Sequence, residues 1–238
     1  MIVFNEENHT YQNFETKEFY TSVSKVLSLY KEPFDKEFHA SRKAIKEGVT
    51  KDEMLAKWDK INKEACDKGH NVHQIVENFI KEGTIEDVNL INAFEKIFNK
   101  KDYKRVLSEE IVYSDKYKIA GTSDMICDVN DDEFDILDLK TNKKFLFHNN
   151  FSKYLKAPLN NLQQCHYNDY SLQLSLYAYL YSGLTNKRVR KICILYHDGE
   201  KFVSYATPYM FWEIQVLLPH FLNNHGQPVI EPNKSNSK

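Results

Sequence analysis

The sequence predicts an α/β fold, in which a mixed central β-sheet is flanked by helices and preceded by a mostly helical N-terminal region. Apolar residues in the first hundred positions recur mainly at helical spacing. Beyond residue 104 the pattern becomes three strands, a helix, two strands and a final helix. A chain of 238 residues with 42% hydrophobic residues is long enough to bury one sizeable core.

We expect one integrated domain made of three segments. Residues 1–104 form the N-terminal meander and helical region, residues 105–231 form the core, and residues 232–238 form a polar, disordered tail. The net charge of -2 shows no overall basic bias, so any nucleic-acid contact must come from a local patch.

Cysteine spacing and hydropathy exclude several classes of protein. The four cysteines are widely separated, with no CxxC pair, which argues against a zinc ribbon. The N-terminus has no basic segment followed by an apolar run, and no stretch reaches the roughly 18 apolar residues of a membrane span. We therefore expect a soluble, cytoplasmic protein that is neither secreted nor membrane-bound.

The N-terminal region begins with alternating residues over 2–20, which predict a small antiparallel meander. Ser22 or Ser24 can cap a short helix, and Asp35 can cap another that Gly48 ends. Thr50 with Glu53 three residues later forms a capping-box pattern and predicts a long helix. This helix resumes or continues past residue 69 and stops at residue 83, and a further helix follows over 86–99.

The core pattern follows from residue 105 onward. Strands are predicted over 105–113, 117–129 and 133–141, with turn chemistry at 130–132. An irregular polar region, 143–168, leads to a helix over 170–182 that Gly183 ends. Strands over 189–196 and 201–206 share a tight turn, and a last helix covers 210–224.

The segment 117–144 carries the strongest chemical signal. Because side chains alternate along a strand, Asp138 and Lys140 share one face while Leu137 and Leu139 face the other. Pairing the two strands can bring Asp124 beside them. Two carboxylates and a lysine on one sheet face suit a divalent cation and a phosphate, although such a pair on a strand is more often a solvated surface.

Four short motifs in this order resemble those of the PD-(D/E)XK nuclease superfamily. The helix 69–77 resembles G-x-x-x-H-x-x-x-E, residues 121–124 resemble G-x-x-D, residues 138–141 resemble D-x-K-T, and residues 173–177 resemble Q-x-x-x-Y. Within that superfamily they are similar to the RecB-type exonuclease branch, which includes phage exonucleases and the mitochondrial genome maintenance exonuclease. The resemblance implies a restriction-endonuclease-like central sheet.

The same resemblance implies a site for one or two Mg²⁺ or Mn²⁺ ions. His73, Asp124, Asp138 and the backbone carbonyl of Leu139 are the expected ligands, with Glu77 and Glu110 as further candidates. Alternation does not decide whether Glu109 or Glu110 faces the site. No iron–sulfur cluster is expected, because the required cysteine spacing is absent.

Catalysis and DNA binding are expected from residues around the two strands and the helix that follows. A bound cation activates water and neutralises phosphate charge, while Lys140 orients the water or stabilises the transition state. Gln173 and Tyr177 share a helix face and would hold the scissile strand, unless they only belong to an amphipathic helix. Further DNA contacts are expected from Thr141, Lys143, Lys144, Tyr154 and Lys156.

The sequence therefore predicts a metal-dependent DNA exonuclease for recombination, repair or end processing, acting on single-stranded or duplex ends. A phage origin, with the protein in the cytoplasm of a bacterial host, is compatible with the resemblance. Two alternatives stay open. One is a structure- or sequence-specific endonuclease of the same superfamily, serving defence or restriction, and the other is a non-catalytic DNA-binding module.

Overall fold

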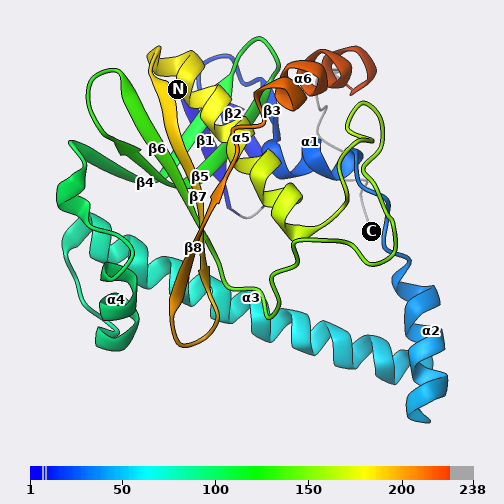
Figure 1. Cartoon of the computed structure of the whole chain (residues 1–238). Coiled ribbons are helices and arrows are strands. Elements are labelled where there is room, and N and C mark those ends of the chain that lie inside the picture. Colours follow the sequence, from blue (N-terminus) through cyan, green and yellow to red (C-terminus); the bar gives the residue numbers. More distant parts are fainter. Residues whose placement is uncertain (7, 9, 226–238) are drawn as a thin grey trace, which may run out of the picture.

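The computed structural model describes residues 1–6, 8 and 10–225 as an eight-stranded mixed sheet with helices on both faces (Figure 1). The elements follow in the order β1 (Ile2–Asn5), β2 (Thr10–Asn13), β3 (Phe19–Ser22), α1 (Val23–Leu29), α2 (Lys36–Glu47), α3 (Lys51–Glu82), α4 (Val88–Glu95), a 3₁₀ turn (Lys100–Asp102), β4 (Arg105–Ser114), β5 (Ile119–Asp128), β6 (Glu133–Lys140), α5 (His166–Thr185), β7 (Arg188–His197), β8 (Phe202–Thr207) and α6 (Phe211–His225). The predicted α/β class with a mixed sheet and a helical N-terminal region is confirmed.

The sheet forks beside β5. Its strand order is β1-β2-β3-β5-β6-β7-β8, and β4 pairs with β5 along the other edge. The pairs β3–β5 and β6–β7 are parallel, and the remaining pairs are antiparallel. On one edge of β5, β3 pairs with Ile119 and Ala120, whereas β6 pairs only from Met125 onward. Between Ala120 and Met125, β3 and β6 therefore diverge from this edge of β5 and leave a fork. Asp124 lies at this fork.

Two hydrophobic cores cover the two faces of the sheet. Alternate residues of β5, β6 and β7, such as Ile126, Ile136 and Ile194, pack against α1, α5 and α6. Their neighbours, such as Leu137 and Leu139, pack against α3 and α4. This alternation is the expected consequence of the two-residue period of a strand, and it anchors the helices that carry predicted site residues.

The ends of several helices follow local capping rules. Ser22, Asp35 and Thr50 cap α1, α2 and α3 through their side chains, and Thr50 with Glu53 forms the predicted capping box. The helix α3 runs without interruption through Gly69, a residue that costs about 1 kcal/mol in a helix interior. Its packing in the second core offsets that cost.

Two predicted helix boundaries are wrong. The helix predicted over 86–99 is shorter, because α4 covers only Val88–Glu95 and turns follow it. The helix α5 is longer than predicted, since it begins at His166 and passes through Gly183 to Thr185. Asn186 ends it instead, with the left-handed φ of 60° that asparagine tolerates. The predicted tail, 232–238, lies outside the described residues.

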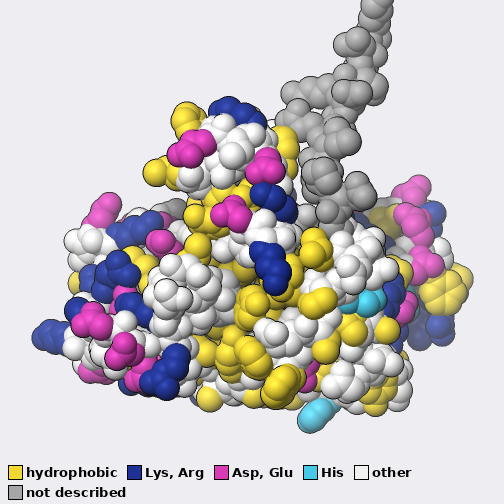
Figure 2. Space-filling model, turned by 90° about the horizontal axis from the view of Figure 1, so that it is seen from above, with side chains coloured by type: hydrophobic (Ala, Val, Ile, Leu, Met, Phe, Trp, Pro, Cys, Tyr) yellow, Lys and Arg dark blue, Asp and Glu magenta, His cyan; other side chains and the backbone are white. Residues whose placement is uncertain are grey.

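Hydrophobic side chains gather across the face seen from above, where α6 lies (Figure 2). Exposed residues of α6 on the surface include Phe211, Trp212, Val216 and Leu222.

Among the described residues, no helix combines the length and the apolar character needed to cross a bilayer.

Candidate metal and catalytic site

The fork beside β5 brings the two predicted aspartates together. Because Met125 pairs with Leu137 in an antiparallel ladder, Asp124 lies opposite Asp138 and faces the same side. The Asp124 side chain also bonds the neighbouring strand directly, since the Leu139 N–H donates to its Oδ2 at 2.7 Å. The side chain thus links the two strands at the point where the ladder ends.

The helix α3 supplies the predicted histidine. His73 Nδ1 lies 3.5 Å from Asp124 Oδ2. Val72, Ile75 and Val76 are buried in the second core and fix the rotation of the helix. One turn before His73, a Cβ added to Gly69 would lie 3.0 Å from Thr141 Oγ1, so a small residue allows this close approach to the end of β6.

A third potential ligand comes from β4, where the sequence left open whether Glu109 or Glu110 faces the site, and it is Glu109. Ser108 pairs with Met125 and Glu110 with Ser123 in one continuous register, so Glu109 lies opposite Asp124, with a left-handed φ of 54°. This backbone conformation interrupts the regular alternation of side chains at Glu109. Ligand atoms of His73, Glu109 and Asp124 all lie within 4.8 Å of one another, and Glu110 does not belong to this group.

Asp138 and Lys140 form a buried ion pair beside this group. Asp138 is 1% exposed and contacts the Lys140 ammonium through Oδ2. Burial, followed by repulsion from Asp124, raises the pKa of Asp138 to about 6 despite the ammonium. Although burial disfavours the charged lysine, the carboxylates of Asp138 and Asp124 raise the pKa of Lys140.

Glu109 experiences the same crowding of negative charge. Burial contributes most, and the carboxylates of Asp124 and Glu77 add to it, so that the pKa of Glu109 rises to about 7. Glu77 itself pairs with Lys81 at 2.5 Å and lies outside the group of three potential ligands. Carboxylates with raised pKa values in one place are a common mark of a cation or catalytic site.

A groove of about 800 Å³ opens above these residues. Predicted site residues along its wall are His73, Glu77, Asp124, Leu139, Lys140 and Thr141. Glu109, Gly69, Asn142 and Tyr170 line it as well. A concave site with converging polar groups of this kind can take a charged substrate.

Tyr170 is a site residue that was not predicted from the sequence. The Lys140 ammonium lies 5.0 Å from the centre of its ring, within cation–π range. Its hydroxyl donates to Asn142 Oδ1 at 3.3 Å. Tyr170 precedes Gln173 by three residues on α5, and this helical spacing was the signal that could have identified it.

Gln173 and Tyr177 are not among the residues that line the groove. Tyr177 is 5% exposed, and its hydroxyl accepts a hydrogen bond from Gln173 Nε2 at 3.0 Å. A Cβ on Gly121 would lie 2.6 Å from the Tyr177 ring, so the ring packs directly on the β5 backbone. This burial suits Tyr177 to support the fork and gives it little access to a substrate.

The remaining predicted DNA contacts occupy the loop between β6 and α5. Lys143, Lys144, Tyr154 and Lys156 are exposed and lie outside the groove wall. A bridge between Tyr154 and Gln163 and a bond from Lys156 N to Tyr30 O at 2.7 Å tie down the middle of this loop.

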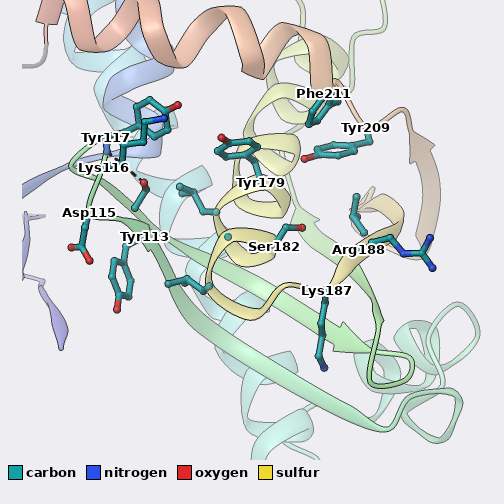
Figure 3. Close-up of a pocket in the computed structure, with 15 residues that line it drawn as sticks. Tyr113, Asp115, Lys116, Tyr117, Tyr179, Ser182, Lys187, Arg188, Tyr209 and Phe211 are labelled. Carbon is teal, nitrogen blue, oxygen red and sulfur yellow. Dashed lines mark hydrogen bonds between the residues drawn. The ribbon is translucent and has the colours of Figure 1, made fainter.

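A second cavity of about 620 Å³ lies near the start of β7, where Arg188 begins the strand (Figure 3). Aromatic side chains such as Tyr179, Tyr209 and Phe211 line it together with Lys187. Lys140 pairs with Tyr196, near the other end of β7, and none of the predicted site residues lines this second cavity.

No family model matches the chain, and no curated protein matches it. Two of the solved structures that resemble it show the level of likeness. A candidate exonuclease from Eubacterium rectale is 11% identical, with a TM-score of 0.42 over 94% of this chain and 85% of that protein. SSO0001 is 14% identical, with a TM-score of 0.37 over 88% of this chain and 77% of that protein. Identities and TM-scores this low do not indicate the function of this chain.

Proposed function

We propose that this chain is a divalent-metal-dependent deoxyribonuclease that acts as an exonuclease on DNA ends. One observation carries the proposal. Ligand atoms of His73, Glu109 and Asp124 converge within 4.8 Å, next to the buried Asp138–Lys140 pair, in one groove. This is the set of groups that phosphodiester hydrolysis with a metal ion requires.

The donor set fits a hard or borderline divalent cation. Carboxylate oxygens suit Mg²⁺ and Mn²⁺, and the imidazole nitrogen of His73 favours Mn²⁺ somewhat. Burial, and after it repulsion from neighbouring carboxylates, raises the pKa values of Glu109 and Asp138, and a bound cation would offset that repulsion. His73, Glu109 and Asp124 would hold the ion, with Asp138 and the carbonyl of Leu139 as further donors. When bound, the ion supplies activated water and neutralises phosphate charge.

Lys140 is the proposed catalytic residue of the chain itself. Contact with Asp138 and with the ring of Tyr170 holds its ammonium at the groove wall. A fixed positive charge there orients the attacking water and stabilises the charge that develops on the phosphate. Thr141 lies on the same wall and can donate its hydroxyl to a neighbouring phosphate oxygen.

Action on DNA ends rests on the order of the four motifs, which resembles that of RecB-type exonucleases. The exposed Lys143, Lys144, Tyr154 and Lys156 lie in the loop directly after β6, where they can contact the backbone of a bound strand. Gln173 and Tyr177 would act by supporting the fork.

The test is digestion of end-labelled single-stranded, duplex and closed circular DNA with Mg²⁺, Mn²⁺ or EDTA. Metal-dependent loss of label from linear DNA, with the circle intact, is the expected result. Equal digestion of the circle would replace the exonuclease with an endonuclease. DNA binding without cleavage in either metal would reject the enzymatic function.

A further inference from the structure

Aromatic residues from the start of α2 and the outer half of α3 form a cluster that the proposed catalytic groups do not use. We name the cluster formed by Phe34, Phe38, His39 and Trp58 the aromatic arm. Phe34 and Phe38 are 63% and 52% exposed, which is unusual for rings of this size. The arm lies where α2 meets the far end of α3, away from the sheet (Figure 1).

The rings of the aromatic arm contact one another. Phe34 and His39 stack with centroids 4.6 Å apart and an angle of 4° between their planes. Phe34 also lies 6.4 Å from Trp58, which packs on the small core of Ala40, Ala44 and Met54. The arm is therefore a preorganised surface, and an exposed aromatic face on it can extend the stack by one more flat ring.

The catalytic groove and a hollow beside the arm lie next to each other along α3. Phe34, Trp58 and Ile61 line this hollow, and Asn62 and Ala65 line both it and the catalytic groove. Positions 58, 62, 65, 69 and 73 recur at helical spacing and so share one face of α3. Ala65 and Gly69 have small side chains, so nothing bulky protrudes from the middle of this face.

We propose that the aromatic arm binds unpaired bases of the DNA strand whose scissile phosphate lies at Asp124. This inference rests on the proposed nuclease function. Fifteen residues separate Trp58 from His73, so about 22 Å of helix joins the two places. At about 3.4 Å per nucleotide of a stacked strand, that distance corresponds to roughly six or seven nucleotides. Stacking on aromatic rings tolerates any base sequence.

One cation lies beside an exposed ring of the arm. The Arg42 guanidinium lies 5.6 Å from the centre of the Phe38 ring, whereas Lys36 on the wall of the hollow is paired with Asp59. Proteins that bind single strands combine exposed rings, which stack on the bases, with cations, which contact the phosphates.

The test compares Phe34→Ala with Phe14→Ala in the full chain, because both phenylalanines are 63% exposed. Substrates are a single-stranded thymidine 12-mer and a thymidine trimer with Mn²⁺. For Phe34→Ala, kcat/KM on the 12-mer is expected to fall at least about fivefold more than on the trimer. Phe14→Ala should match the wild type on both, and Phe34→Trp should restore cleavage of the 12-mer.

Equal loss on both lengths, or no loss, would overturn the inference while leaving the nuclease function standing. If the wild type cleaves neither of these single strands, the digestion series with duplex DNA decides the nuclease function, and binding decides the present inference. Fluorescence anisotropy of the labelled 12-mer in EDTA should then show at least about fivefold weaker binding for Phe34→Ala than for Phe14→Ala. Equal affinities, or an equal effect on a blunt 12-base-pair duplex, would reject a platform for unpaired bases.

Discussion

The two ends of the β5–β6 hairpin both bury aspartates, but they neutralise them differently. At the turn end, Asp128 and Asp135 have cationic partners within the chain. At the fork end, Asp124, Asp138 and Glu109 face one another, and Lys140 is the ammonium in contact with Asp138. The first arrangement is a closed structural network, whereas the second still attracts positive charge.

At the turn end, Asp128 receives the Arg105 Nε–H at 2.9 Å, the Tyr181 hydroxyl at 3.1 Å and the Lys187 ammonium at 2.9 Å. Burial alone would raise the pKa of Asp128, but Lys187 and Arg105 lower it below the ordinary value. Asp135 is bound by both Nε and Nη2 of Arg190, at 2.9 and 2.6 Å. Bidentate pairs of this kind satisfy a buried carboxylate.

The largest loss of activity is expected when one aspartate at the fork is neutralised. Asp124→Asn should lower metal-dependent cleavage of linear DNA by at least about 10²-fold, because it removes a proposed ligand. The free energy of unfolding should change little or increase without metal, since repulsion with Asp138 and Glu109 is relieved. Full activity of this variant would refute the proposed site.

The matching change at the turn end should act on stability. Asp135→Ala leaves Arg190 and Tyr103 without their partner at a fully buried position and should cost about 2–4 kcal/mol. Urea denaturation measures this loss. Cleavage per folded molecule should stay near that of the wild type, and a stable variant with lost activity would contradict the separation of the two ends.

Metal binding should stabilise the folded protein through the fork end alone. At a Mn²⁺ concentration about 100 times Kd, the gain should be about 2.7 kcal/mol. Thermal unfolding with and without Mn²⁺ measures it, and His73→Ala should reduce the gain by removing a ligand. An unchanged melting temperature in the wild type would mean that the carboxylates hold no ion.

Without metal, stability should fall as pH rises from about 4.5 to 7. The pKa of Glu109 rises from 4.5 to about 7 on folding, so in this window the folded protein keeps a proton that the unfolded chain has lost. Asp138 acts in the same direction up to about pH 6. Glu109→Gln should flatten this slope and add about 1–2 kcal/mol at pH 8, after allowance for partial exposure.

The smallest expected effect concerns the ring beside Lys140. Tyr170→Leu should lower the cleavage rate about two- to fivefold, because the ammonium loses its cation–π contact. Tyr170→Phe keeps the ring and should retain most of the activity. Similar losses in both variants would assign the effect to the hydroxyl that bonds Asn142 instead.

Features that depend on neighbours along the chain could be predicted from the residues alone. The capping box of Thr50 and Glu53, the turn at 130–132 and the shared face of Asp138 and Lys140 follow from local hydrogen bonding and strand alternation. The motif order also identified His73, which lies beside Asp124.

Tertiary structure alone decided the features that depend on how distant segments pair. Pairing of β4 with β5 placed Glu109 opposite Asp124, which strand alternation had left open between Glu109 and Glu110, since strand register is not encoded within one strand. Close packing on Gly121 buried Tyr177, and contact across the groove placed Tyr170 beside Lys140. Periodicity indicates which face a residue occupies, but only the assembled sheet and helices determine what lies opposite it.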